Sequence, residues 1–142
     1  MKKLYIPGLT LVLAVLPLTV SADDFDGSKP FLCAMIDVTE CVPVAGCQRV
    51  SADAIDAPRF IKVDLANKTM SARFAGGERS SEIERHESVD GKLMLQGVED
   101  GREKERDGIG WTLSVAKDRG DMVLTGSGDN VGFVIFGSCT HL

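Results

Sequence analysis

The chain has 142 residues, 44% of them hydrophobic, and a formal net charge of −5. This length excludes a TIM-barrel enzyme and a two-domain dehydrogenase, and the hydrophobic content excludes a disordered chain. Because 21 acidic residues outnumber 16 lysines and arginines, we expect neither nucleic acid nor an anionic membrane surface as a partner.

The first 22 residues differ in kind from the rest. Met1–Lys3 is a short positive segment, Leu4–Val20 is almost wholly apolar, and Val20–Ala22 supplies the small residues that a signal peptidase recognises. The apolar run is interrupted and no basic stop-transfer cluster follows it, which disfavours a membrane anchor. We therefore predict a signal peptide over residues 1–22, and a periplasmic or secreted domain over residues 23–142 without a membrane span. Its net charge would be −7, because two of the 16 basic residues leave with the leader.

The first predicted strand, Phe31–Val38, contains the first of four cysteines. An even number of cysteines in an exported domain indicates disulfides, and three pairings are possible. A sheet that closes on itself would bring Cys33 and Cys139 together, and Cys41 and Cys47 would then close the small loop between them. The cysteines lack the close pairs and histidine partners of a zinc site, so we predict no metal site.

Ser51 is a candidate N-cap for a short helical turn that Pro58 would end. Beyond it, apolar and polar residues alternate over 60–65 and over 69–74, which predicts a half-buried hairpin. The sequence Asn67-Lys68-Thr69 is a glycosylation sequon, but the short Lys2-Lys3 leader is typical of bacteria, so we interpret the sequon as part of the turn between two strands.

Further turn signals divide the rest of the chain. Ser81–Val89 is a polar, weak strand candidate, and Asp90-Gly91 is a strong hairpin signal. Glu99–Gly108 is a mixed-charge loop. Arg119-Gly120-Asp121 matches a cell-adhesion motif, although Gly and Asp are also what a tight turn requires. Three later segments alternate or are wholly apolar and are predicted strands: Trp111–Val115, Met122–Thr125 and, as a central or closing strand, Val131–Phe136.

Strands joined by short turns, without a helical stripe or a second domain, indicate an all-β antiparallel meander. Closing such a sheet removes its exposed edges. We predict a small up-and-down β-barrel or rolled meander sheet of about 7–8 strands, stapled by disulfides. A β-sandwich is the alternative, but the immunoglobulin pattern of a core Trp between two bridging cysteines fits poorly, because three of the four cysteines precede Trp111 near the N-terminal end.

Few residues suggest catalysis. Glu84, His86 and Ser88 would share one face of a strand, but they would face solvent without a pocket or oxyanion donors. His141 is next to last and expected to be frayed. Gly126-Ser127-Gly128 is not followed by the helix that a phosphate-binding loop needs. We therefore predict no catalytic residues, no cofactor and no enzymatic activity.

The aromatic residues on predicted strands are the more interesting set. We expect five of them to pack together: Phe60, Phe74, Trp111, Phe133 and Phe136. Small barrels can enclose a ligand, so Trp111, Phe60, Phe74 and Phe133 are our candidate ligand-binding residues. The predicted function is the binding of a small apolar ligand or an envelope component. The alternative is a protein-binding module, such as an inhibitor of an envelope hydrolase, that uses the loops Glu99–Gly108 and Gly126–Asn130.

Two resemblances add to this interpretation. The blocks Asp26–Cys33, Gly91–Gly97, Gly110–Leu113 and Val131–Cys139 resemble those of small exported bacterial proteins of unknown function. That resemblance implies a single exported domain and no particular activity. Thr125-Gly126-Ser127-Gly128 is similar to the Ser/Gly-rich loop of envelope lysozyme inhibitors, which are also small disulfide-bearing barrels, although the aromatic residue that follows is displaced to Phe133.

Overall fold

The computed structural model describes residues 25–101, 104 and 107–142, so the predicted signal peptide of residues 1–22 lies outside the described residues. Within them, one short 3-10 helix accompanies nine strands, and all nine belong to one antiparallel sheet. The elements are β1 (Phe31–Val42), β2 (Gly46–Val50), η1 (Ala52–Ile55), β3 (Phe60–Asp64), β4 (Thr69–Phe74), β5 (Gly77–Val89), β6 (Lys92–Glu99), β7 (Ile109–Ala116), β8 (Asp121–Gly128) and β9 (Val131–His141).

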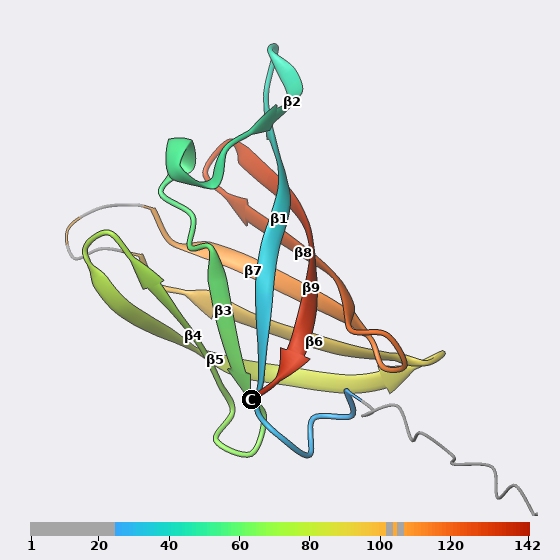
Figure 1. The fold of residues 1–142 in the computed structure, drawn as a ribbon. Coiled ribbons are helices and arrows are strands. Elements are labelled where there is room, and N and C mark those ends of the chain that lie inside the picture. Colours follow the sequence, from blue (N-terminus) through green and yellow to red (C-terminus); the bar gives the residue numbers. More distant parts are fainter. Residues whose placement is uncertain (1–24, 102–103, 105–106) are drawn as a thin grey trace, which may run out of the picture.

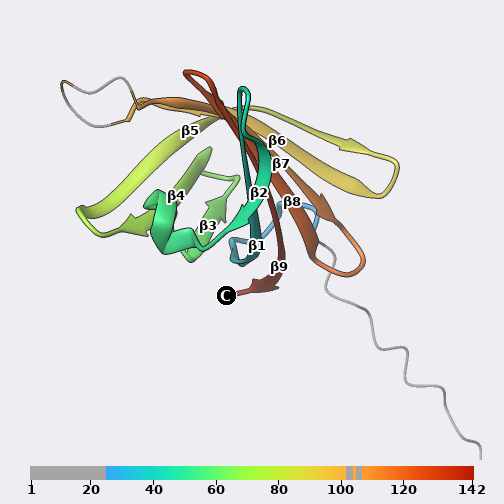
Figure 2. The ribbon, with the colours of Figure 1, turned by 90° about the horizontal axis from the view of Figure 1, so that it is seen from above.

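Eight of the strands close into a barrel. Each strand from β3 to β8 pairs with the next one in the chain, and β1 pairs with both β3 and β9. Figure 1 shows this ring from the side, and Figure 2 looks onto the end that carries η1 and β2. The predicted all-β, up-and-down barrel is therefore confirmed, and the β-sandwich alternative is wrong. Val131–Phe136 lies in β9, which is the closing strand as expected.

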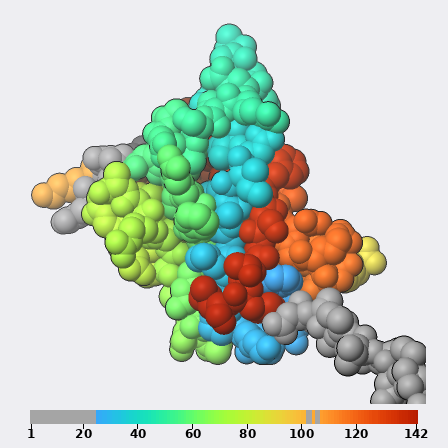
Figure 3. All heavy atoms as spheres, in the orientation of Figure 1, coloured from blue at the N-terminus to red at the C-terminus, as the bar shows by residue number. Residues whose placement is uncertain are grey.

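β1 is longer than predicted and belongs to two parts of the molecule. Its first residues pair with β3, and its last five, from Val38 to Val42, pair with β2. A bulge between Met35 and Asp37 shifts the register with β9 and leaves Ile36 exposed. The extra residue lets side chains on both sides of the bulge point inward, because it resets the alternation of faces. Beyond the barrel, β1 and β2 project as a two-stranded hairpin (Figure 1, Figure 3).

Both expected disulfides are present. Cys33–Cys139 joins directly opposed residues of β1 and β9, and Cys41–Cys47 joins directly opposed residues of β1 and β2. The first bridge lies in the core, since Cys33 is fully buried and Cys139 is 8% exposed. The second lies in the projecting hairpin. One disulfide therefore links the two strands that close the barrel, and the other stabilises the hairpin.

Alternation of side chains places one apolar face of every barrel strand inside. β6, β7 and β8 contribute pairs and triplets at two-residue spacing, as expected for strands with a single buried face. The fully or nearly fully buried set includes Ile61, Val63, Leu93, Leu95, Leu113, Val115, Met122 and Leu124. The interior is thus packed along most of its length by aliphatic side chains.

The end of the barrel that holds Phe25 and the C-terminus is filled by aromatic rings. Phe25, only 6% exposed, stacks on His141 with ring centroids 4.4 Å apart, and its edge meets Phe31 at 5.6 Å. The prediction that His141 is frayed is wrong, because β9 continues to this residue and its ring lies in that stack. This end of the barrel is closed.

Two local predictions can also be compared with the structure. The weak strand candidate Ser81–Val89 is part of β5, a strand of 13 residues. Only its first half faces the core, where Ser81 and Ile83 are buried; the second half is exposed. The predicted helical turn is present as η1, capped by a hydrogen bond from the Ala54 amide to Ser51 Oγ at 3.3 Å. β5 was only a weak strand candidate because its second half does not pack on the core and is therefore polar.

Candidate ligand cavity

Phe25, Phe31 and His141 form an aromatic plug at one end of the barrel. A cavity of about 360 Å³ occupies the opposite end. Its walls come from the end of β4, the start of β5, the start of β7, the end of β8 and the start of β9. Ile55, the last residue of η1, and the residues after it up to Pro58 also line the cavity. The barrel therefore has one filled end and one hollow end.

The walls are mostly apolar. Trp111, Phe74 and Phe133 all line the cavity, so the structure brings together three of the four candidate ligand-binding residues. Aliphatic and thioether side chains complete the surface, among them Met35, Ile55, Ile61, Met70, Ile109, Leu124, Val131 and Ile135. Such a surface favours a ligand whose body is hydrocarbon or aromatic.

Phe60, the fourth candidate, lies outside the cavity. Its side chain is 54% exposed, because Ile61 and Val63 take the inward positions of β3 and alternation turns Phe60 outward. Phe136 is likewise 48% exposed on the outer face of β9. The expectation that five aromatic residues pack together is therefore wrong for these two. The alternation visible in the sequence around Phe60 already contained this signal.

Two glycines leave room in the wall. Gly126 and Gly128 stand at inward positions near the end of β8, where other strands carry side chains. A Cβ added at Gly126 would lie 3.4 Å from Ile109 Cδ1 and 3.8 Å from Phe133 Cδ2, which are ordinary contact distances. A larger side chain at this position would therefore extend into the cavity.

Trp111 forms the inner wall of the cavity. Its indole covers Gly97, the residue directly opposite on β6, so closely that a Cβ at Gly97 would collide with the ring. The side chain is only 4% exposed, and its Nε1 N–H has no hydrogen-bond partner within the described part of the chain. A buried N–H without an acceptor costs about 1–3 kcal/mol. The ring is thus fixed in place by packing rather than by a polar contact.

The barrel wall has a seam beside the cavity, between β5 and β6. Their pairing runs from Glu82 opposite Val98 to Val89 opposite Lys92, so the first residues of β5 pair with β4 alone. Arg79 crosses this seam. Its Nη1 lies 3.1 Å from Glu99 Oε1 on β6. A salt bridge therefore stands where the backbone ladder is missing.

Arg79 is held from two further sides. Its guanidinium carbon lies 3.5 Å from the centroid of the Phe74 ring, which is a cation–π contact. Its Nη2 lies 4.0 Å from Asp56 Oδ2, at the residue that caps η1. The side chains of Arg79 and Glu99 are 27% and 17% exposed, so the pair is half-buried at the rim. Sequence reasoning missed both residues, because they are 20 positions apart and no local pattern joins them.

A second, polar hollow of about 340 Å³ adjoins the first one. Arg79, Ser80, Ser81 and Glu99 line both hollows, so the salt bridge stands between them. The outer hollow is otherwise bordered by Glu82, Glu84, Val98, Asp100 and Gly101. We call it the outer groove. An apolar cavity and an acidic groove thus meet at one salt bridge.

The other candidate motifs form no site in the structure. His86 is exposed on β5, and no hydrogen bond joins it to Glu84 or Ser88 among the described contacts. Within the ranges that the structure describes, no group of three or more metal-ligating side chains occurs. Those same ranges contain no helix long and apolar enough to cross a membrane.

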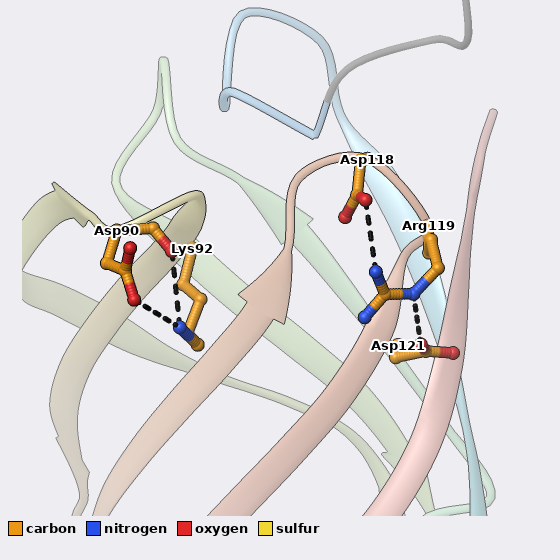
Figure 4. Close-up of polar contacts among 5 residues, drawn as sticks. All are labelled: Asp90, Lys92, Asp118, Arg119 and Asp121. Atoms are coloured by element: carbon orange, nitrogen blue, oxygen red, sulfur yellow. Dashed lines mark hydrogen bonds and ion pairs between the residues drawn. The ribbon is translucent and has the colours of Figure 1, made fainter.

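The Arg119-Gly120-Asp121 sequence serves the turn between β7 and β8. Arg119 Nε lies 3.0 Å from Asp121 Oδ2, and its Nη1 lies 3.0 Å from Asp118 Oδ2 (Figure 4). These contacts, above all the hydrogen bond to Asp121, raise the pKa of Arg119. A comparable contact joins Lys92 to Asp90 in the β5–β6 turn. The Arg119 guanidinium is thus paired with carboxylates of its own turn, which agrees with the interpretation of this motif as a turn.

Fold and site together define a small, disulfide-bearing β-barrel with an apolar cavity at one end. In comparisons with known proteins, no family model matches the chain, and no match is found among curated proteins or among solved structures.

Proposed function

We propose that this protein is a non-enzymatic binding protein that takes a small apolar ligand into the open end of its barrel. The observation that carries the proposal is the apolar cavity beside Trp111. Its volume of about 360 Å³ lies in the range of small-molecule sites and corresponds to about twelve water-sized groups. A ligand with a body of that size would replace water against Trp111 and Phe133.

Binding fits the lining better than catalysis does. Neither histidine is among the described residues that line the cavity. Arg79 and Glu99, two of its charged groups, are paired with each other. The two disulfides support a location outside the reducing cytosol, and with the predicted leader we propose a periplasmic or secreted protein.

The test uses Trp111, the only tryptophan in the chain, as a fluorescent reporter. The oxidised protein is titrated with 1-decanol, an uncharged ligand of matching size, while its emission is followed. We expect saturable binding and a higher melting temperature, because a ligand that binds only the folded state stabilises it. Gly126→Leu should weaken binding at least about tenfold, because it fills the cavity.

Gly132→Val is the matched control, since this β9 glycine is not among the lining residues and an added Cβ would meet only one atom, at 3.9 Å. Its binding should equal that of the unmodified protein. Equal binding by a folded Gly126→Leu variant would contradict the assignment of the cavity.

The projecting β1–β2 hairpin favours a second candidate function, the binding of another protein. Its tip, Pro43–Ala45, is exposed and carries no charge. Val44 is fully exposed and has φ +70°, a conformation that is rare for a β-branched residue. The Ala45 amide donates to the Pro43 carbonyl across it at 2.8 Å, which makes a strained γ-turn. A braced, apolar tip of this kind suits insertion into a cleft of a folded partner, such as an envelope hydrolase.

This second function differs from the sequence-based hypothesis in its contact surface, since it uses the hairpin rather than the loops Glu99–Gly108 and Gly126–Asn130. A photo-crosslinking residue placed at position 44 should capture a specific partner in the native envelope, whereas the same residue at exposed position 87 should not. Equal capture from both positions would contradict a role for the tip, as would an unchanged partner after Val44→Asp.

A further inference from the structure

We propose that the ligand of the cavity carries one uncharged oxygen group, a hydroxyl or a carbonyl, that forms a hydrogen bond with the side chain of Ser81. This inference rests on the proposed ligand-binding function and adds the chemical class of the ligand. It is carried by a buried hydroxyl in the cavity wall that has no hydrogen-bond partner within the described part of the chain.

Ser81 is a polar exception in an apolar interior. At 8% exposed, it is the one buried polar or charged residue among those that the structure describes. It lies directly opposite Met70 of β4, and both residues line the cavity. The buried Ile83 follows two positions further along β5, so alternation points the Ser81 side chain inward as well. Because a serine side chain consists only of Cβ and the hydroxyl, this hydroxyl faces the cavity.

Two polar groups of the cavity wall lack a hydrogen-bond partner within the described residues, the Ser81 hydroxyl and the Trp111 N–H, but they differ in access. Nε1 of Trp111 is almost completely enclosed by protein atoms, and the edge of the ring beside it packs on Gly97. The Ser81 Oγ is not among the enclosed atoms. The hydroxyl is therefore the group that a ligand in the cavity can reach.

A purely apolar ligand would leave this hydroxyl unsatisfied. A ligand that fills the cavity excludes water from its walls, and a buried hydroxyl without a hydrogen-bond partner costs free energy. A ligand oxygen beside Ser81 avoids that cost, since a serine hydroxyl can both donate and accept. Such a contact also orients the ligand, as the few polar groups of an apolar pocket generally do.

The arrangement of the walls sets that orientation. Arg79, Ser81 and Ile83 occupy successive inward positions of β5, so charge, hydroxyl and hydrocarbon follow one another from the rim inward. In the ring of eight strands, three strands separate β5 from β9 in either direction, so Phe133 of β9 lies on the opposite wall. The oxygen group would bind at Ser81 just below the rim, and the apolar body would extend across the cavity toward Phe133.

The surroundings of Ser81 favour an uncharged group over a charged one. Arg79 and Glu99, which line the same boundary between the cavity and the outer groove, already pair with each other at 3.1 Å. The Ser81 hydroxyl supplies a dipole but no opposite charge. Moving a carboxylate or an ammonium group from water to such a site therefore costs more solvation than one hydrogen bond returns.

The experiment compares five ligands that share the carbon skeleton of butylbenzene: the hydrocarbon itself, 4-phenyl-2-butanone, 4-phenyl-2-butanol, 4-phenylbutanoate and 4-phenyl-2-butanamine. Each is titrated into the oxidised protein at neutral pH, with calorimetry and Trp111 emission as readouts. The ketone and the alcohol should bind more tightly than the carboxylate and the amine. Because the ligands also differ in their solubility in water, the hydrogen bond itself is isolated by comparing protein variants for each ligand.

Ser81→Ala removes the hydroxyl and leaves the shape of the wall nearly unchanged. We expect it to weaken the binding of the ketone and the alcohol about fivefold, as the loss of a typical hydrogen bond does, and to leave the affinity for butylbenzene within about twofold. Ser88→Ala is the matched control, since it makes the same substitution at an exposed β5 residue outside both linings. It should leave all five affinities unchanged.

A second measurement does not depend on a variant. The infrared carbonyl band of the bound, isotopically labelled ketone should lie at a lower frequency than the band of the same ketone in hexane, because a hydrogen bond weakens the C=O bond. A bound ketone with the hexane frequency would have no donor beside its carbonyl, which would overturn the pairing with Ser81.

The outcomes separate this inference from the proposed function. If Ser81→Ala weakens the binding of the ketone and of butylbenzene equally, or of neither, the hydrogen bond to Ser81 is wrong and the cavity remains a binding site. Tightest binding of the carboxylate or the amine would overturn the uncharged group. If none of the five ligands binds to the unmodified protein, the proposed function is wrong as well.

Discussion

At the residue scale, two glycines of the inner wall differ in how much space they leave for a side chain. Gly126 leaves space, since an added Cβ would find ordinary contacts only. Gly97 leaves none, because a Cβ there would overlap the Glu82 carbonyl oxygen and the Trp111 ring. The position of Trp111, and with it the inner wall of the cavity, therefore depends on the absence of a side chain at Gly97.

We expect Gly97→Ala to lower the free energy of unfolding by about 3 kcal/mol, because one methylene forced into a packed interior costs about 1–3 kcal/mol and one of the atoms met here is backbone. Urea unfolding followed by Trp111 emission measures the change. Gly132→Ala, where the added atom has space, should change stability by less than about 1 kcal/mol. Equal stability of the two variants would contradict the close packing of the ring on Gly97.

A second residue-scale prediction concerns the turn between β3 and β4. Asp64 accepts hydrogen bonds from the Asn67 side-chain amide at 2.8 Å and from its backbone N–H at 3.1 Å. These bonds, above all the one from the Asn67 side chain, lower the pKa of Asp64 below its usual 3.8. When the pKa of a carboxyl group is lower in the folded state than in the unfolded state, the group stabilises the fold at pH values above its unfolded-state pKa. This stabilisation is lost as the pH falls through the folded-state pKa.

Asn67→Ala should therefore raise the pKa of Asp64 toward its usual value, and the stability lost on acidification below pH 3.8 should be smaller. An NMR titration of the Asp64 carboxyl carbon measures the shift. The exposed Asp129 carboxyl in the same titration serves as the control, and an Asp64 pKa that does not change on substitution would contradict this account.

The residue with the left-handed backbone in this turn is Lys68, at φ +52°, rather than Asn67.

At the element scale, β1 is divided by its bulge into a barrel strand and one arm of a hairpin. The barrel part pairs with β3 and β9. The part after the bulge pairs with β2 on one side, whose residues up to Arg49 are exposed, and up to Cys41 it also pairs with β9 on the other side. An ion pair between Arg49 and Asp37, at 2.6 Å, and the Cys41–Cys47 disulfide brace this hairpin. Among the described strands, β2 pairs with β1 alone, so we expect β2 and the hairpin tip to open while the barrel stays folded.

Removal of the Cys41–Cys47 bridge by a double substitution to alanine should lower the global free energy of unfolding by no more than about 2 kcal/mol, because the bridge closes a short loop with a sequence separation of 6. The same variant should speed amide hydrogen exchange over residues 42–50, because local opening of the hairpin no longer has to break a covalent link. Exchange in β6 and β7 is the internal control. A large loss of global stability would show that the hairpin belongs to the folding core.

At the scale of the whole molecule, the barrel is closed by the pairing of the first and last strands. β1 and β9 are far apart in sequence, and Cys33–Cys139 joins them with a separation of 106 residues. A bridge over so long a loop restricts the unfolded chain strongly, by about 4–5 kcal/mol in the chain-entropy model. The bridge lies in the filled half of the barrel, between the aromatic plug and the cavity.

Replacing Cys33 and Cys139 together by alanine should lower the free energy of unfolding by about 4–5 kcal/mol, far more than the equivalent change at Cys41 and Cys47. Denaturant unfolding of both double variants provides the comparison, and each variant controls for loss of a disulfide as such. Similar losses in both would contradict the assignment of one bridge to the barrel and the other to the hairpin.

The alternation of apolar and polar residues by itself predicted an all-β antiparallel meander and most strand positions, and the aromatic residues on those strands include three that line the cavity, Phe74, Trp111 and Phe133. It does so because alternation is a local property of a strand that packs on one face. It also held the information that Phe60 points outward, since Ile61 and Val63 occupy the inward positions of β3.

Only the tertiary structure decided which end of the barrel is hollow and which groups guard it. Arg79 meets Glu99 across a seam where β5 and β6 no longer pair, and no sequence pattern records that divergence. Likewise, Gly97 and Gly126 are the same residue type, yet one is covered by an indole and the other faces the cavity. Space inside a fold depends on what the facing strands place opposite each residue, which is why the chain had to close before its cavity could be seen.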